Sequence, residues 1–400
     1  MDLHGGAPWW LIEHGLTSPA PPLTGEHRCE VLVIGAGVTG ALLADALTCA
    51  GRQVVVVDRR DPGLGSTVAS TALLQYETDV ELTELIDLVG LGNAVRAYQL
   101  GLEAIRWVGA LQDELGDIGF SELPSLYLAS ARGHRQRLQA EAAVRQVHGL
   151  PATFLSAEDV AEGYGFPSHG AILSTNAGLV DPLLLTRKLL DRAARSGASI
   201  HGKTTAGRCD ASTHHVDVEL SGGARVRADW VVFAGGYEVP QQLRDDLVDL
   251  HSTFALVTEP ARAGRWNGQC LVWESARPYT YLRPAGAGRI MIGGEDVPFR
   301  NARLRDRMIP ARTERLEKRL KQLLPDVHCS ADYAWAGTFG ETDDGLPYIG
   351  PQTSGGRLLF ALGYGGNGIT FSAIAAMLLT ELISGHASPD AAIFALDRAG

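Results

Sequence analysis

The stretch EVLVIGAGVTG at residues 30–40 decides the fold of this chain. Its first five residues are a short apolar run, which is typical of a buried parallel strand, and glycines in the order GxGxxG follow directly. An apolar segment over residues 41–50 predicts a helix, and the run VVVV at residues 54–57 predicts a second buried strand. Residues 30–58 are therefore expected to form one β-α-β unit.

The glycines of this turn predict a dinucleotide site. Gly35 permits the tight turn, Gly37 lets a pyrophosphate approach the backbone, and Gly40 lets the helix pack closely on the strand. The first turn of the helix, with Val38 and Thr39, offers free N–H groups and a partial positive charge to the phosphates. A glycine turn with only a packing role is the alternative, which the complete strand-helix-strand context disfavours.

The second strand ends at an acidic residue. Asp58 follows Gly40 by 18 residues and is expected to accept a hydrogen bond from a ribose hydroxyl. A carboxylate would repel a 2′-phosphate, which disfavours NADP here even though Arg59 is next in the chain and is expected at the nucleotide. The same segment continues into small hydroxylated residues that could bind phosphate or ribityl oxygens, with a solvated loop as the alternative. The candidates are Ser66, Thr67, Ser70, Thr71 and Ala72.

A second glycine-rich turn, GYGGNGIT at residues 363–370, favours FAD over NAD. It precedes an apolar helix, whose N-terminus would stabilise negative charge on a flavin ring. An NAD enzyme has little use for such a distant second loop, although a simple capping turn is an alternative. The residues expected to contact the flavin here are Gly365, Gly366, Asn367, Gly368, Ile369 and Thr370.

Length and composition exclude several other classes of protein. The 400 residues suit two interleaved domains, and a net charge of −11 without a basic run disfavours nucleic-acid binding. The five cysteines are scattered and form no CxxC pair, so we expect no metal site and a reducing, cytoplasmic environment. The N-terminus does not read as a signal peptide, and no stretch reaches the roughly 18 apolar residues of a membrane helix.

Five segments together resemble the D-amino-acid oxidase/glycine oxidase/sarcosine oxidase (DAO) family of FAD enzymes. They are residues 30–58, GLVDP at 178–182, AGG at 234–236, DGLPYIG at 344–350, and the turn at 363–370. The resemblance covers nearly the whole chain. In addition, PWW at residues 8–10 and STALLQYE at 70–77 resemble a bacterial subgroup near the gamma-glutamylputrescine oxidases.

The resemblance implies an α/β fold with a Rossmann-like FAD-binding domain and an interleaved substrate domain on a mostly antiparallel sheet. We assign residues 1–27 to an N-terminal arm, residues 28–85, 151–250 and 335–400 to the FAD-binding domain, and residues 86–150 and 251–334 to the substrate domain. Ala234, Gly235 and Gly337 are expected at the cofactor. The implied reaction oxidises the C–N bond of an amine or amino acid to an imine, which then hydrolyses.

Two departures from the family affect the chemistry. Some relatives attach flavin through a cysteine before the DGLPxIG segment, but residues 335–344 contain none, so we expect non-covalent FAD. Some sarcosine-type oxidases use a lysine over the flavin to activate oxygen, whereas the strand RIMIG at residues 289–293 has none. The acceptor is therefore oxygen or, in a dehydrogenase of the same fold, a quinone or carrier. A catalytically silent flavin-binding partner subunit is a third hypothesis. The sequence does not determine the oligomeric state.

The substrate contacts expected from the sequence lie in two segments. In RPYTYLR at residues 277–283, strand alternation would place Arg277, Tyr279, Tyr281 and Arg283 on one face, where an arginine could clamp a substrate carboxylate. A solvated face is the alternative for this strand.

The second segment follows the flavin-side loop, where Tyr76 and Glu77 could meet the substrate amine. The catalytic candidates are thus Tyr281, Arg283, Tyr76 and Glu77. We expect His251 to be structural, and residues 214–215 to lie on the surface rather than bind metal.

Overall fold

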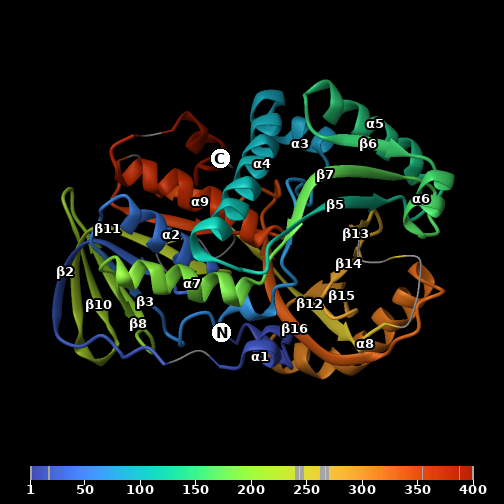
Figure 1. The fold of residues 1–400 in the computed structure, drawn as a ribbon. Helices are drawn as coiled ribbons and strands as arrows, with labels where there is room; N and C mark the ends of the chain where they lie inside the picture. Colours follow the sequence, from blue (N-terminus) through green and yellow to red (C-terminus); the bar gives the residue numbers. More distant parts are fainter. Residues whose placement is uncertain are drawn as a thin grey trace.

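The computed structural model describes residues 2–16, 19–238, 243, 247–261, 266, 270–353, 355–386 and 388–398. Their strands form one sheet of eight strands and one of ten. In Figure 1 the eight-stranded sheet lies on the left and the ten-stranded sheet on the right.

The eight-stranded sheet is built around the predicted β-α-β unit. Its central strands run parallel in the order β18-β11-β2-β3-β8, and β17 joins β18 in the antiparallel sense. The strands are β2 (Glu26–Ile34), β3 (Val54–Val57), β8 (Ser199–His201), β9 (Ala206–Ala211), β10 (Val216–Leu220), β11 (Arg225–Gly236), β17 (Tyr348–Pro351) and β18 (Leu358–Leu362).

Three helices cover one region of this sheet (Figure 1): α2 (Val38–Cys49), α7 (Pro182–Arg195) and α9 (Gly368–Ile383). Asp181 begins α7 because its carboxylate accepts hydrogen bonds from two backbone N–H groups of the first turn. Helix α9 is apolar on all sides and is buried between α2 and α4, which explains its lack of a polar face.

The ten-stranded sheet is mostly antiparallel, as predicted, with β13 and β5 as a parallel pair. Its path is β1-β16-β12-β15-β14-β13-β5-β7-β4, and β6 pairs with β7. The strands are β1 (His4–Gly6), β4 (Leu73–Leu74), β5 (Ser121–Leu128), β6 (Ala152–Leu155), β7 (Ala171–Leu179), β12 (Asp249–Thr258), β13 (Leu271–Glu274), β14 (Tyr281–Pro284), β15 (Ile290–Pro298) and β16 (Ala331–Glu341).

The remaining helices surround this sheet and bridge it to the other. Helix α8 packs on β12, β15 and β16, and α4 contacts both α7 and α9. The α-helices are α1 (Trp9–His14), α3 (Leu82–Val89), α4 (Leu91–Leu115), α5 (His134–Val147), α6 (Ala157–Tyr164) and α8 (Ala302–Leu323), and short 3-10 helices span Ser66–Ala69, Ser221–Gly223 and Pro389–Phe394.

Strand pairing departs from the expected boundaries at several places. We assigned residues 28–85 to the FAD-binding domain, but β4 pairs with β7 in the ten-stranded sheet. We assigned residues 151–250 to the FAD-binding domain, but β6 and β7 pair within the ten-stranded sheet. We also assigned residues 335–400 to it, but this range contains most of β16, which belongs to the ten-stranded sheet. Local apolar alternation predicts a strand but carries no information on which distant strand pairs with it.

The N-terminal arm is part of the structure rather than a loose extension. Strand β1 adds to the edge of the ten-stranded sheet through β16, and Trp9 and Trp10 of α1 are buried. The Trp10 indole N–H donates to the carbonyl of Ser70 at 2.7 Å. The two tryptophans therefore anchor the arm to the rest of the protein.

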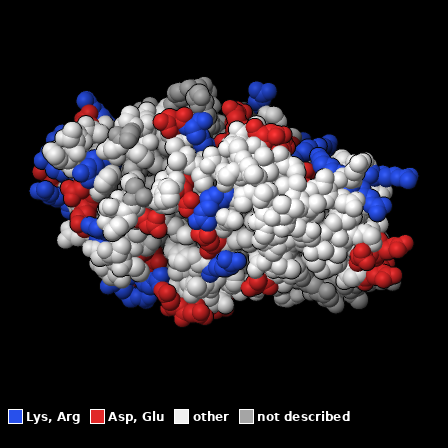
Figure 2. Space-filling view, turned by 90° about the horizontal axis from the view of Figure 1, so that it is seen from above, with Lys and Arg blue, Asp and Glu red and all other residues white. Residues whose placement is uncertain are grey.

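On the surface, acidic and basic side chains are interspersed over the face drawn in Figure 2. Among the residues that the structure describes, none of the helices has the length and apolar character needed to cross a membrane.

Candidate functional site

A cavity of about 570 Å³ is lined by residues of both sheets. This volume lies within the range of small-molecule and cofactor sites, roughly 300–1,000 Å³. Gly37 of the first glycine turn and Gly366 of the second both line it. Two turns that lie far apart in sequence therefore meet at one cavity, as a shared extended cofactor requires.

The first glycine turn connects β2 to α2 and opens onto this cavity. Gly35 has a φ of 119°, which strongly favours glycine, and its N–H donates to Val57 at 2.8 Å. A Cβ atom on Gly40 would lie only 1.8 Å from the carbonyl oxygen of Gly35. Gly40 therefore serves close packing, and it lies outside the cavity lining, where Gly35, Gly37, Val38 and Thr39 are found.

Asp58 lies at the end of β3 and holds the turn in shape. Its carboxylate accepts hydrogen bonds from the backbone N–H groups of Ala36 and Arg60, each at 2.7 Å. Burial raises the pKa of Asp58 above its ordinary value. Asp58 and Arg59 line the cavity, and Arg59 pairs with Glu238, which follows the end of β11. The ribose hydrogen bond stays a prediction.

The hydroxylated segment after Asp58 lines the same cavity. Its short 3-10 helix brings Thr67 to the start of α2, where the Thr67 hydroxyl accepts from the Val38 N–H at 3.0 Å. The Ser66 hydroxyl oxygen is buried without a hydrogen-bond partner among the described residues. All five predicted residues line the cavity, namely Ser66, Thr67, Ser70, Thr71 and Ala72.

The second glycine turn leads into α9. Thr370 is the one predicted residue of this turn that does not line the cavity. Its hydroxyl is buried and has no hydrogen-bond partner among the described residues. The first turns of α2 and α9 touch, because the hydroxyls of Thr39 and Ser372 lie 2.7 Å apart. The other predicted residues that line the cavity are Ala234, Gly235, Gly337, Gly365, Gly366, Asn367, Gly368 and Ile369.

These features fit an extended dinucleotide such as FAD. Two helix N-termini open onto one cavity, each preceded by glycines whose bare backbone leaves room for a ligand. The unpartnered Ser66 hydroxyl is a further donor for a ligand oxygen. The α2 end would hold the pyrophosphate, and the α9 end would face the flavin ring.

The predicted arginine clamp is wrong for Arg283. Strand β14 begins only at Tyr281, so the expected alternation does not extend back to Arg277. The buried Arg283 guanidinium lies outside the cavity lining and donates to the carbonyls of Thr71, Ala72 and Val180, each at 3.0 Å. Burial lowers the pKa of Arg283 to about 9, so the guanidinium stays charged at neutral pH.

Arg283→Gln is therefore expected to lower the free energy of unfolding by about 2–3 kcal/mol, because several buried carbonyls lose their donor. Flavin content should fall with it, since Thr71 and Ala72 line the cavity. Urea unfolding and the flavin-to-protein absorbance ratio would measure both effects. Arg225→Gln, whose side chain on β11 is 66% exposed, is the matched control. Unchanged stability with a selective rise in substrate KM would instead support the clamp.

Tyr76 is not available to a substrate, contrary to our expectation. Its side chain is buried outside the cavity lining, and its hydroxyl lies 3.1 Å from the carbonyl of Pro151 and 3.2 Å from the hydroxyl of Ser174. Burial raises the pKa of Tyr76 well above its ordinary value. Tyr76 therefore has a structural role.

Glu77 lines the cavity, but its carboxylate points into the protein, 3.4 Å from the buried Arg145. Its carbonyl accepts a hydrogen bond from the Asn367 side chain in the second glycine turn. Glu77 therefore links the interior of the protein to that turn. Tyr281, in contrast, lines the cavity beside Tyr279, with the two ring centroids 5.7 Å apart.

The sequence reasoning missed two acidic residues of the cavity, Asp79 and Asp296. Asp79 accepts from the Gly366 N–H at 2.7 Å and from the Tyr279 hydroxyl at 2.9 Å. Asp296 lies on β15, and burial raises its pKa to about 7. An acid within the apolar strand segment IMIGGEDVP was the available signal for Asp296. Nothing in the local pattern around Asp79 indicated its position.

The three histidines considered from the sequence lie outside the cavity lining. His251 lies 3.6 Å from the Glu341 carboxylate, and the described residues contain no cluster of three or more metal-ligating side chains. His214 and His215 lie exposed or partly exposed at the turn between β9 and β10.

Comparisons with known proteins agree with this arrangement. A family model described as DAO, FAD dependent oxidoreductase, matches residues 30–382. The chain is 25% identical over 370 residues to glycine oxidase of Bacillus licheniformis, which covers 90% of this chain and 94% of that protein. It is 24% identical over 400 residues to gamma-glutamylputrescine oxidoreductase of Escherichia coli (strain K12). That match covers 92% of this chain and 87% of the oxidoreductase.

Among solved structures, glycine oxidase from Geobacillus kaustophilus has a TM-score of 0.78 at 23% identity, over 93% of this chain and 99% of that chain. This likeness shows a shared fold. Because the family model spans most of the sequence and the two glycine turns meet at one cavity, the chain belongs to the DAO family of FAD dependent oxidoreductases.

Proposed function

We propose that this enzyme oxidises the C–N bond of an amine or amino acid to an imine, with FAD held non-covalently between the two glycine turns. One observation carries the proposal: a single cavity joins both turns to a group of aromatic and acidic side chains on the ten-stranded sheet. The names of the relatives, glycine oxidase and gamma-glutamylputrescine oxidoreductase, support the same reaction class.

The residues of the chain bind and orient the reactants. When bound, FAD supplies the hydride acceptor. The N-terminus of α2 holds the phosphates, and the glycines before α9 allow close approach of the ring. Tyr281, Tyr279 and Trp273 form an apolar wall that excludes water from the substrate carbon. Such positioning is sufficient for hydride transfer from a neutral amine, which needs no strong base.

A second candidate is a dehydrogenase of the same fold that passes electrons to a quinone or carrier. Strand β15 reads IMIGGEDVP and carries no lysine where some sarcosine-type oxidases use one with oxygen. The scattered cysteines support the further proposal that the protein works in the cytoplasm.

Anaerobic mixing of the purified protein with a panel of amines and amino acids tests the proposal. We expect a yellow protein whose flavin is released by acid precipitation and whose absorbance bleaches with at least one amine or amino acid. No bleaching by any compound would contradict the proposed reaction and favour a silent flavin-binding partner subunit. Oxygen is then admitted to the bleached protein, and slow recovery of absorbance would favour the dehydrogenase.

A further inference from the structure

One part of the cavity, here called the inner end, is formed by side chains of the ten-stranded sheet and its loops. It comprises Thr253 of β12, Trp273 of β13, Tyr279 just before β14, Tyr281 at the start of β14, and Asp296 of β15. The inner end combines three aromatic rings with one carboxylate. This combination favours a cation, because ring faces and a carboxylate both attract positive charge.

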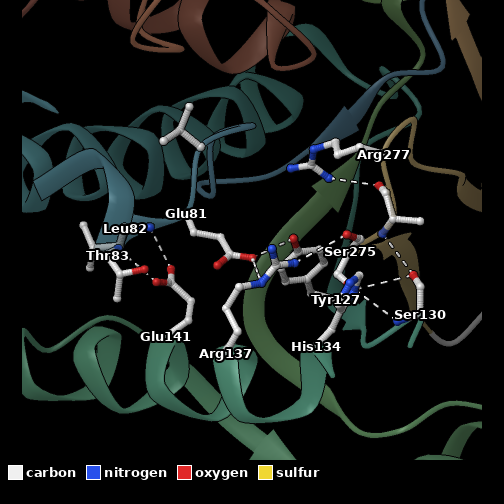
Figure 3. Close-up of polar contacts among 12 residues, drawn as sticks. Glu81, Leu82, Thr83, Tyr127, Ser130, His134, Arg137, Glu141, Ser275 and Arg277 are labelled. Atoms are coloured by element: carbon white, nitrogen blue, oxygen red, sulfur yellow. Dashed lines mark hydrogen bonds and ion pairs between the residues drawn. The ribbon is translucent and has the colours of Figure 1, made fainter. Parts of the chain in front are cut away.

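The aromatic wall is held in place from behind. The Trp273 ring stacks on Tyr127 with centroids 3.7 Å apart, and the Trp273 N–H donates to Ser125 at 3.1 Å. The Tyr127 hydroxyl in turn donates to Glu81 at 2.9 Å, and Glu81 also faces Arg137 (Figure 3). These contacts fix the ring orientation before any ligand arrives, which reduces the entropy lost on binding.

Among the residues that the structure describes, none forms an ion pair with the Asp296 carboxylate of the inner end. The Asp296 Oδ1 atom is buried and has no hydrogen-bond partner among the described residues. A buried and unpartnered acceptor carries a desolvation cost that a bound ammonium donor would relieve. A substrate carboxylate would instead meet like charge from Asp296 and Asp79.

The arginines near the cavity are engaged elsewhere. Among the described lining residues the cationic side chains are Arg59 and Arg60, and both pair with Glu238 at the nucleotide end. Arg283 donates to four carbonyls, the three described above and that of Pro284. Arg277 donates to the carbonyl of Asp79 at 2.9 Å and to that of its neighbour Ala276 at 3.2 Å.

We propose that the inner end binds a cationic alkylamine that carries no carboxylate beside its amine, with Asp296 as the counter-ion and the aromatic rings around the cation. This inference rests on the proposed function and narrows its substrate from amines and amino acids to amines. Asp296 is then a substrate-binding residue that holds the ammonium form of the substrate. The bound ammonium passes one proton to a carboxylate or to water before the neutral amine gives up its hydride. Specificity comes from an acidic and aromatic site instead of an arginine clamp.

The affinity for such a cation should rise as the pH increases from about 6 to about 8. Burial raises the pKa of Asp296 to about 7, Asp79 and Glu295 raise it further, and the Thr253 hydroxyl and Arg277 lower it. The pKa of Glu341 is also raised to about 7, mainly by burial and in addition by the charges of Asp79 and Asp296. Both carboxyls therefore lose their protons over this interval, which strengthens the attraction for an ammonium.

Calorimetric titration of the flavin-loaded protein with two probes that share a tert-butyl group and carry opposite charges tests the proposal. The probes are tert-butylammonium and pivalate, which carry no hydrogen on the carbon next to the charged group and therefore cannot be oxidised there. We expect the ammonium to bind at least about tenfold more tightly than pivalate, and Asp296→Asn to remove most of that preference. Asp217→Asn, at an acid on β10 whose side chain is 46% exposed, is the matched control and should change neither affinity.

Tighter binding of pivalate, or equal binding of both probes, would overturn the proposal, and so would an Asp296→Asn protein with unchanged preference. Loss of pivalate binding in Arg277→Gln would identify a carboxylate clamp instead.

If Asp296→Asn does not fold, the pH series on the unaltered protein decides, and an ammonium affinity that does not change with pH would contradict the proposal. If amino acids alone bleach the flavin, this inference fails while the proposed function stands. If no compound bleaches it, the probes still report the charge preference.

Discussion

Gly40→Ala is expected to give a protein that is purified without flavin and is destabilised by about 3 kcal/mol or more. The added Cβ atom would lie 1.8 Å from the carbonyl oxygen of Gly35 and 2.8 Å from its carbonyl carbon. Both are backbone atoms of the turn, so no side-chain rotation can relieve the clash. Helix α2 must move away from β2, and its free N–H groups then leave the cavity.

Gly92→Ala provides the matched control for this substitution. Gly92 is exposed near the start of α4, and a Cβ atom there would meet nothing within 4 Å. This variant should keep its flavin and gain up to about 1 kcal/mol from the better helix propensity of alanine. The flavin-to-protein absorbance ratio and urea unfolding measure both variants. A Gly40→Ala protein with full flavin content would show that the close packing of α2 is not required.

Arg145→Met is expected to lower the free energy of unfolding by about 3–5 kcal/mol, because it leaves two buried carboxylates without their cation. The side chains of Arg145 and Glu141 are 0% exposed and that of Glu77 is 1% exposed. Arg145 donates to Glu141 at 2.7 Å and faces Glu77 at 3.4 Å. The same Glu141 carboxylate accepts from the backbone N–H groups at the start of α3 (Figure 3).

The pKa of Glu141 reflects this network. Burial alone would raise it, but Arg145 and the backbone donors hold it below its ordinary value. A carboxyl whose pKa is lowered by folding stabilises the protein above its unfolded-state pKa. That contribution is lost as the pH falls through the lowered value. Removing Arg145 should therefore reduce the stability advantage of neutral over acidic pH.

Arg227→Met is the control, because Arg227 pairs with Asp217 on the exposed face of β10 and β11, where an ion pair contributes at most about 1 kcal/mol. Combining Arg145→Met with Glu77→Gln and Glu141→Gln should restore part of the lost stability, since no uncompensated charge stays buried. Flavin retention should follow stability, because Glu77 contacts Asn367 in the second glycine turn. Equal effects of the two arginine variants would contradict this account.

Local patterns were sufficient for the elements around the nucleotide. Strand β2, helix α2 and strand β3 are within a few residues of their predicted bounds. Each depends on a run of neighbouring residues with a fixed apolar period, and the turn between them depends on glycine at fixed spacing. Long-range pairing was harder, because β7 carries a strand pattern that is compatible with either sheet.

The sequence by itself determined the cofactor end of this protein, because bare backbone at two glycine turns is a property of the residue type and of its immediate neighbours. The tertiary structure alone decided the substrate end. Arg283 and Tyr281 lie two residues apart on one short strand, where local alternation gives them the same face. Yet Arg283 is bound by the carbonyls of a distant loop, and Tyr281 faces the cavity. The countercharges and the exposure of a side chain depend on segments that are distant in sequence and meet only in the folded protein. No local sequence pattern predicts those contacts.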